Sequence, residues 1–155
     1  MVAPKDDSPT VKNKKAGHLY LIEERLEAGI MLRGTEVKAI RTGKCNLTDS
    51  HVRVKRGELY LVGCHIGAYE AAAPQFNHEP RRERKLLVHR RELDRFLGKI
   101  KVRGYTLIVT KIYFKEGRAK AELSLCKGKK AHDKRSALRE RQVKKEMDRA
   151  IKAHR

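Results

Sequence analysis

The residues that could support catalysis or metal binding are scattered along this chain. Seven histidines occur without an HxxxH pair or any His/Cys ligand spacing: His18, His51, His65, His78, His89, His132 and His154. Zinc sites and nucleophilic sites need such side chains at fixed spacing or beside a pre-oriented base. His132-Asp133 could exchange protons, but the pair lies in an expected linker with nothing to orient it. The sequence therefore predicts no enzyme, no metal site and no cofactor.

The three cysteines, Cys45, Cys64 and Cys126, are an odd number without a CxxC pair. This pattern argues against a disulfide framework and against a thiolate zinc site. We expect buried or half-buried thiols in a reducing compartment. No apolar run approaches the ~18 residues of a membrane span, and the N-terminus lacks a hydrophobic signal region. The expected localisation is cytoplasmic.

Positive charge dominates the composition, with a net charge of +19 and a pI near 10.2. The 29 residues from Lys127 to Arg155 carry 12 Lys or Arg against 4 Asp or Glu. A second cluster comprises Arg81-Arg82, Arg84-Lys85 and Arg90-Arg91. A basic run is often only a solvated surface, but two separate clusters on so small a chain favour a nucleic-acid partner.

Aromatic residues give a weaker signal of nucleic-acid binding. An open barrel face could stack bases on tyrosines, although most of these side chains are expected to fill the core or its rim. Five lie in or beside expected strands: Tyr20, Tyr60, Tyr69, Tyr105 and Tyr113.

The length of 155 residues fits one domain with an appendage. Residues 1–12 contain two prolines and no periodic apolar pattern, so we expect a disordered leader. Residues 13–126 form the expected body, and residues 127–155 the basic tail. The hydrophobic share of 39% is enough for a modest core if both termini stay outside it.

Period-two patterns in the body predict two β-hairpins. The first alternates Val52 and Val54 with basic residues and turns at Arg56-Gly57. The second runs from Leu107 through a turn at Glu116-Gly117 to residue 125. A bulge is expected in residues 18–26 and a turn at residues 27–29.

Two short helices should connect these strands. One spans residues 34–43, with Thr35 as its N-cap and Gly43 as its stop. The other lies within residues 89–104, where Leu93 and Phe96 begin an apolar stripe. The fold class is therefore mainly β: a small closed antiparallel barrel of about six strands with two connecting helices.

The tail has weak helical character. Val143, Met147 and Ile151 recur every four residues, which predicts a helix from about Ser136 onward with one thin apolar stripe. Charge repulsion and little buried surface make such a helix marginal in water. We expect the free tail to be disordered and to become helical where phosphates neutralise it.

Three stretches together resemble the small protein B family, the SsrA-binding proteins of bacteria. They are the segment from Asn13 to Val52, which contains GTEVKAIR, the segment PRRERKLLVHRREL, and KGKKAHDKR. The resemblance runs nearly continuously from Asn13 to the C-terminus. It implies an oligonucleotide-binding (OB) barrel that binds the tRNA-like domain of transfer-messenger RNA.

The resemblance also implies a role in trans-translation. The protein and its RNA would enter the vacant A site of a stalled ribosome, and the ribosome itself would perform the chemistry that adds a degradation tag. Contacts with the RNA elbow would involve Asn13, Glu27 and Leu87, with Lys14 and Lys15 nearby. A carboxylate such as Glu27 could accept hydrogen bonds from base amino groups or sugar hydroxyls.

The tail signature implies a second RNA partner, the small-subunit rRNA. A hinge from Gly128 to Arg135 would meet the decoding centre, where His132 could stack on a base. The helix from Ser136 would probe the empty message channel. The signature residues are Gly128, Lys129, Lys130, His132, Asp133, Lys134 and Arg135.

Two other functions compete with this rescue adaptor, which we expect to be a monomer. A structural rRNA-binding protein of the ribosome would also be small, basic and tailed. A small RNA-processing enzyme would cleave or modify RNA as the purified protein.

Overall fold

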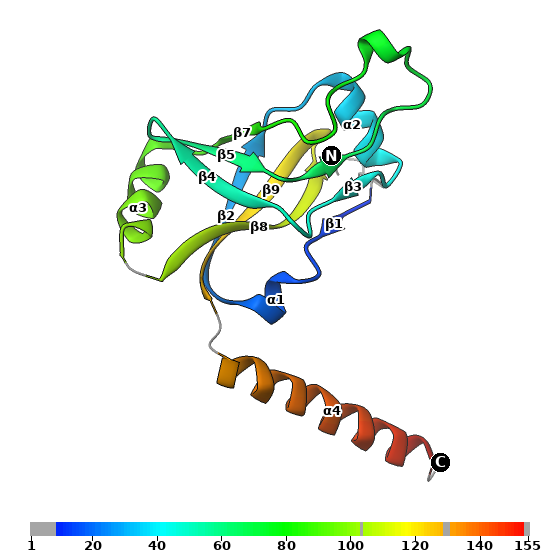
Figure 1. Cartoon of the computed structure of the whole chain (residues 1–155), viewed down its shortest axis with the longest axis vertical. Coiled ribbons are helices and arrows are strands. Elements are labelled where there is room, and N and C mark those ends of the chain that lie inside the picture. The colour runs from blue at the N-terminus through cyan, green and yellow to red at the C-terminus, as the bar shows by residue number, and fades with distance from the viewer. Residues whose placement is uncertain (1–8, 103, 129–130, 154–155) are drawn as a thin grey trace, which may run out of the picture.

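The computed structural model describes residues 9–102, 104–128 and 131–153, and for residues 131–137 the backbone alone. A seven-stranded antiparallel sheet has the order β1-β8-β9-β2-β7-β5-β4, and β3 pairs with β6 in a separate two-stranded sheet. The mainly β prediction is confirmed (Figure 1). The elements are β1 (Val11–Lys12), α1 (Ala16–Leu19), β2 (Tyr20–Ile30), α2 (Gly34–Arg41), β3 (Cys45–Asn46), β4 (His51–Lys55), β5 (Glu58–Val62), β6 (His65–Ile66), the 3-10 turn η1 (Pro74–Phe76), β7 (Arg84–Leu87), α3 (Arg90–Ile100), β8 (Tyr105–Lys115), β9 (Arg118–Gly128) and α4 (Ala131–Ala153).

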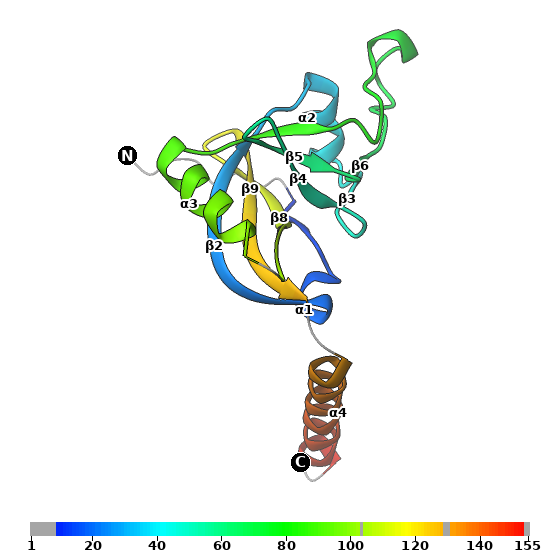
Figure 2. The ribbon, with the colours of Figure 1, turned by 60° about the vertical axis from the view of Figure 1, so that its left-hand side comes forward.

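The large sheet curls until its two margins meet. β4, one edge strand, lies against β8, which is paired with β1, the other edge strand. Figure 2 shows the strands wrapped in this way, with α2 and α3 beside the sheet. The enclosed core is almost wholly aliphatic, and its fully buried members include Ile40, Leu47, Leu59, Leu61, Ile66, Val109, Ile112, Leu123 and Leu125.

Both predicted hairpins are present. β4 pairs with β5 and β8 with β9, and each pair is joined by a two-residue turn. Arg56 and Gly57 have φ values of 51° and 74°, and Glu116 and Gly117 have 53° and 75°. Two consecutive positive φ values mark the turn whose twist matches that of the strands, and glycine takes the second position without strain.

The expected turn at residues 27–29 is wrong. β2 runs unbroken to Ile30, and Gly29 pairs with Leu87 of β7 on one side and Lys120 of β9 on the other. The glycine serves close packing here, because a Cβ on Gly29 would lie 3.3 Å from Leu87 Cβ. The expected bulge is confirmed between Ile22 and Glu24.

Both connecting helices are present, with one change at the first. α2 is preceded by Arg33, and not Thr35, at the N-cap position. Thr35 lies in the first turn, with its hydroxyl 2.9 Å from His78 Nδ1. His78 Nε2 lies 2.8 Å from the Ile66 carbonyl, which can only accept a hydrogen bond. In the neutral ring, Nε2 is therefore the protonated nitrogen, and the Thr35 hydroxyl donates to Nδ1.

The ends of the barrel differ slightly from the expected boundaries. β1 pairs with β8 two residues before the boundary placed at Asn13, and β9 continues to Gly128. The expected disorder of residues 1–12 falls mostly on residues 1–8, which lie outside the described residues. Among the residues described, no helix is long and apolar enough to cross a membrane.

Candidate RNA-binding site

One face of the large sheet points away from the core and carries two of the expected body contacts, Glu27 and Leu87. Strand alternation places its side chains opposite the buried ones, and the pairing Glu27↔Glu122↔Lys111 joins three strands across it. We call this surface the outer face. It consists of Arg25, Glu27 and Gly29 of β2, Lys85 and Leu87 of β7, Lys111, Tyr113 and Lys115 of β8, and Lys120 and Glu122 of β9.

Glu27 is held in place on the outer face. The Tyr113 hydroxyl donates to Glu27 Oε2, and Lys115 Nζ lies 3.6 Å from Oε1. The hydrogen bond from Tyr113 is the main cause that lowers the pKa of Glu27, while its partial burial opposes the shift. Burial and the neighbouring carboxylate raise the pKa of Tyr113. The side chain is therefore an ionised acceptor that remains 39% exposed.

Leu87 lies on β7, the strand next to β2, and on the same face of the sheet as Glu27. Its side chain rests over Gly29, the β2 residue two positions beyond Glu27 and on the same face. Leu87 is 48% exposed, unusual for a leucine on a strand. A hollow of about 240 Å³ opens next to it, and its lining combines Glu58, Lys85 and Arg90 with the apolar residues Leu59, Leu86, Leu87, Val88 and Leu93.

Asn13 lies elsewhere on the sheet. It follows the edge strand β1, and strands β8 and β9 lie between β1 and β2. At ordinary strand spacing, β1 and β2 are about 14 Å apart. Its side chain bonds within the chain: Nδ2 donates to the Val109 carbonyl at 3.3 Å, and Oδ1 accepts from the Lys15 amide at 3.3 Å. The structure thus brings Glu27 and Leu87 together and places Asn13 apart from them.

Lys14 and Lys15 are exposed in the turn that Asn13 shapes before α1. Lys15 lines a second hollow of about 340 Å³, which also includes Asn13, Asp49 and His51. The expected elbow residues therefore form two groups, one around Glu27 and one at the start of α1.

Arg84 was expected in a basic surface cluster, and this part of the expectation is wrong. Its side chain is completely buried. Arg84 Nε donates to Glu36 Oε2 at 2.5 Å, Nη1 donates to the Cys64 carbonyl at 2.6 Å, and Nη2 donates to the Pro80 carbonyl at 3.0 Å. Arg84 therefore anchors the start of β7, the strand that presents Leu87.

Glu36 completes this buried network from α2. Its carboxylate also accepts from Arg82 Nη2 at 2.5 Å and from the Arg33 amide at 2.9 Å. Burial alone would raise the pKa of Glu36, but the bonds from Arg82, the Arg33 amide and Arg84 outweigh it and lower the pKa. Sequence alone gave no signal for this network, because its members are 48 residues apart and resemble surface charges.

The tyrosines are half-buried, and lysines cover several of their rings. Lys127 Nζ lies 4.6 Å from the centre of the Tyr105 ring, and Lys111 Nζ lies 5.3 Å from that of Tyr113. Lys38 and Lys55 cover Tyr69 and Tyr60 in the same way. These contacts use the π faces that a base would need, so the structure offers little support for stacking on these tyrosines.

The tail signature begins where β9 ends. Gly128 pairs with Tyr20 as the last residue of β9, and α4 begins at Ala131, five residues before the expected start near Ser136. Lys129 and Lys130 lie outside the described residues. The signature residues in the first turns of α4, whose side chains the structure does not describe, are His132, Asp133, Lys134 and Arg135.

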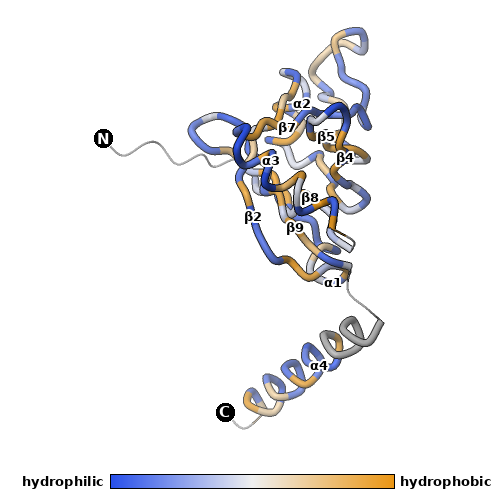
Figure 3. Tube along the Cα trace, turned by 90° about the vertical axis from the view of Figure 1, so that its left-hand side faces the viewer, coloured by the Kyte–Doolittle hydropathy of each residue, from blue (hydrophilic) through white to orange (hydrophobic). Residues whose placement is uncertain are grey.

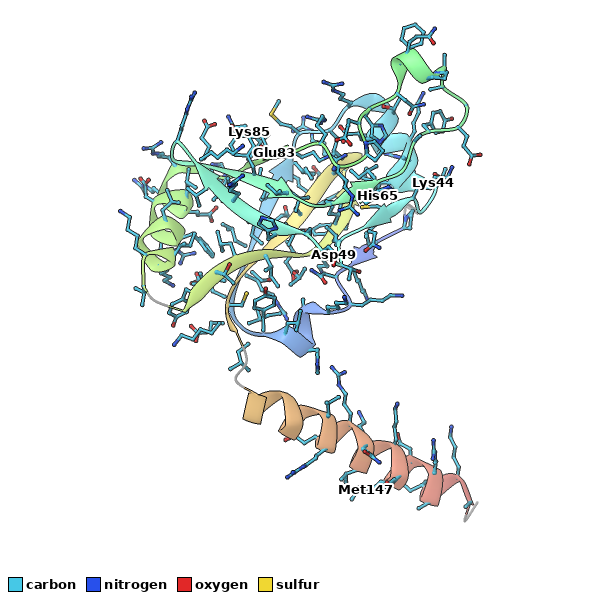
Figure 4. All side chains as sticks on the ribbon, viewed as in Figure 1. Lys44, Asp49, His65, Glu83, Lys85 and Met147 are labelled. Atoms are coloured by element: carbon cyan, nitrogen blue, oxygen red, sulfur yellow. The ribbon has the colours of Figure 1, made fainter. Side chains whose placement is uncertain are left out.

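α4 projects from the barrel as a solvated helix. Every described side chain from residue 138 to 153 is exposed, including Leu138, Val143, Met147 and Ile151 of the apolar stripe. Figure 3 shows hydrophilic and hydrophobic positions interspersed along α4. Met147 points into solvent away from the barrel in Figure 4.

Comparison with known proteins gives a consistent match over most of the chain. The family model described as SmpB protein matches residues 10–153. The SsrA-binding protein of Halalkalibacterium halodurans is 52% identical over 141 residues, which cover 91% of each chain. That of Oceanobacillus iheyensis is 49% identical over 153 residues, covering 97% of this chain and 98% of the relative.

A solved structure shares both sequence and fold with this chain. It is described as "tmRNA-SmpB: a journey to the center of the bacterial ribosome". The matched chain is 48% identical with a TM-score of 0.68, and the match covers 85% of this chain and 96% of that one.

Proposed function

The chain belongs to the SmpB protein family, and from this premise we propose that it binds transfer-messenger RNA and delivers it to stalled ribosomes for trans-translation. Its relatives are named for binding SsrA, and the similar solved structure is named for tmRNA, SmpB and the bacterial ribosome. The observation that carries the proposal is this similarity along nearly the whole chain.

The outer face supports the assignment of the transfer-messenger RNA contact. Five cations lie on this face, Arg25, Lys85, Lys111, Lys115 and Lys120. The first four also form ion pairs with Glu122, Glu58 or Glu27, so phosphates would compete with these carboxylates. Glu27, pre-oriented by Tyr113, supplies an acceptor that cations lack, for base amino groups or sugar hydroxyls. The exposed Leu87 side chain offers an apolar surface beside that acceptor. Charge provides affinity here, and the carboxylate with its apolar neighbour provides selectivity.

The start of α1 is the second part of the proposed RNA contact. Lys14 and Lys15 would neutralise phosphates, and Asn13 would act chiefly by fixing their turn, since its amide bonds to the backbone of β8 and to Lys15. Asn13 is in this proposal a positioning residue.

The tail serves the ribosome in this proposal. Gly128 to Arg135 would meet rRNA in the decoding centre, and α4 would occupy the message channel only where no message fills it. The exposed basic surface of α4 supports this role, because a solvated helix of mixed apolar and cationic character requires a partner to be held. The protein binds and positions RNA, and the ribosome forms the bonds.

Sequencing of the RNA that co-purifies with the full chain tests the proposal. We expect one discrete species with a tRNA-like domain, and sub-stoichiometric association with ribosomes. Stoichiometric association with one ribosomal subunit, without a tRNA-like RNA, would instead show that the chain is a structural protein of the ribosome.

A further inference from the structure

Two cysteines that are distant in sequence meet at one end of the barrel. Cys45 begins β3, and Cys64 directly precedes β6, the partner strand of β3. Their Sγ atoms are 3.7 Å apart. Figure 4 shows Lys44 and His65, the sequence neighbours of the two cysteines, close together in the same region.

The two sulfurs differ in access and are joined by a hydrogen bond. Cys45 is half-buried, whereas Cys64 is buried. The hydrogen bond from the Cys45 thiol lowers the pKa of Cys64, burial opposes this shift, and the Arg84 guanidinium reinforces it. The same contact and burial raise the pKa of Cys45, so the negative charge of a singly deprotonated pair lies mainly on Cys64, whose sulfur can accept the proton of the accessible Cys45 when Cys45 reacts.

We propose that Cys45 and Cys64 form a dithiol site that low-molecular-weight disulfides oxidise to one intramolecular disulfide. The Cys45 sulfur attacks one sulfur of the oxidant while its proton passes to the Cys64 thiolate; the S–S bond of the oxidant breaks, and the first thiol leaves after taking a proton from water. Cys64 then attacks the Cys45 sulfur, and the second thiol leaves. The chain loses two protons and two electrons, and the oxidant is reduced to two thiols.

Formation of this bond requires the two sulfurs to move closer together. A disulfide requires about 2.05 Å between sulfurs, so the two must approach by roughly 1.7 Å. Cys64 lies just outside the β3–β6 pairing and follows Gly63, whose φ is 77°. The bond would close a loop that contains the β4–β5 hairpin and would thereby restrict the unfolded chain.

Cys126 provides an internal control. It is buried in β9, where its thiol donates to the Thr106 carbonyl at 3.5 Å and burial raises its pKa to about 11. It is therefore less accessible than Cys45, and its thiol bonds to a carbonyl and not to a second sulfur that could accept its proton.

Incubation of the reduced full chain with oxidised glutathione in native buffer tests the proposal, with intact mass, peptide mapping and thermal unfolding as readouts. We expect the loss of two hydrogens, no retained glutathione, a Cys45–Cys64 cross-link, and an unfolding midpoint higher by roughly 5–10 °C. Cys126→Ser should behave identically, whereas Cys64→Ser should keep one glutathione on Cys45. Unreacted thiols in the wild type, glutathione retained on it, or a cross-link to Cys126 would each overturn the proposal, whether or not RNA binding is established.

Discussion

The barrel and α4 obtain their structure in opposite ways. The barrel encloses aliphatic side chains on seven antiparallel strands, and even its buried charges, Glu36 and Arg84, are paired. α4 buries none of its described side chains from residue 138 onward and depends on its own backbone hydrogen bonds. Most helix stability in proteins comes from packing, so we expect the barrel to fold by itself and α4 to need a partner for full stability.

This difference separates stability from function in the molecule. Changes in the barrel core should alter folding first, and changes in α4 should alter only what the chain does with a partner. The outer face lies between these extremes, because its side chains are exposed but stand on a rigid sheet.

Removal of α4 is the strongest test of this division of roles between the barrel and α4. A chain that ends at Gly128 keeps all of β9, so its unfolding midpoint should be unchanged. Its dissociation constant for the tRNA-like domain should stay within about twofold of wild type. Tagging on stalled ribosomes should fall by more than roughly 100-fold, which a reconstituted translation assay measures. Normal tagging by the truncated chain would refute the role proposed for the tail.

Breaking the buried network should have the next largest effect. Arg84→Met leaves the Glu36 carboxylate without its main buried partner, and removal of one member of a buried pair costs about 3–5 kcal/mol of unfolding free energy. Urea unfolding measures this loss. Lys55→Met, which breaks the exposed pair with Glu83, is the matched control and should cost under about 1 kcal/mol.

The outer face should respond in binding and not in stability. Glu27→Ala should weaken binding of the tRNA-like domain roughly 10-fold, because a charged hydrogen-bond acceptor is lost. The salt dependence should stay unchanged, whereas Lys15→Ala should reduce its slope by about one. Tyr113→Phe, which removes only the hydroxyl that holds Glu27, should give a smaller loss. Equal slopes for the Glu27 and Lys15 variants would contradict the assigned roles.

The pH dependence of stability should distinguish Glu36 from surface carboxylates. Its pKa is lowered in the folded chain, so the stabilisation it provides is present above the ordinary value of 4.5 and is lost as the pH falls from there through the folded pKa. Glu36→Gln should therefore show a shallower decline of unfolding free energy below about pH 4.5 than wild type. Parallel curves would show that Glu36 does not contribute in this way.

The smallest expected effect concerns α4 in isolation, and it tests the predicted disorder of the free tail. A peptide of residues 129–155 should have a weak helical signal by circular dichroism in water, and inorganic polyphosphate should increase it. Ala150→Pro should suppress that increase. A strongly helical free peptide would show that α4 needs no partner.

Much of the fold followed from local patterns. Alternating residues such as Val52 and Val54, and the Arg56-Gly57 and Glu116-Gly117 turns, specify hairpins because side-chain period and turn chemistry act over a few residues. The turn expected around Gly29 was wrong for the converse reason. A glycine that breaks a local pattern is also what a distant side chain, here Leu87, needs for close packing.

The sequence by itself determined the antiparallel hairpins, the basic tail with its charge, and the family to which the chain belongs. The tertiary structure alone shows which charges lie on the outer face and which are buried, how Tyr113 orients Glu27, and that Cys45 and Cys64 are in contact. The reason is physical. Periodicity and charge are properties of neighbouring residues, whereas a hydrogen bond or a sulfur contact depends on positions that the chain fixes only when distant strands pair.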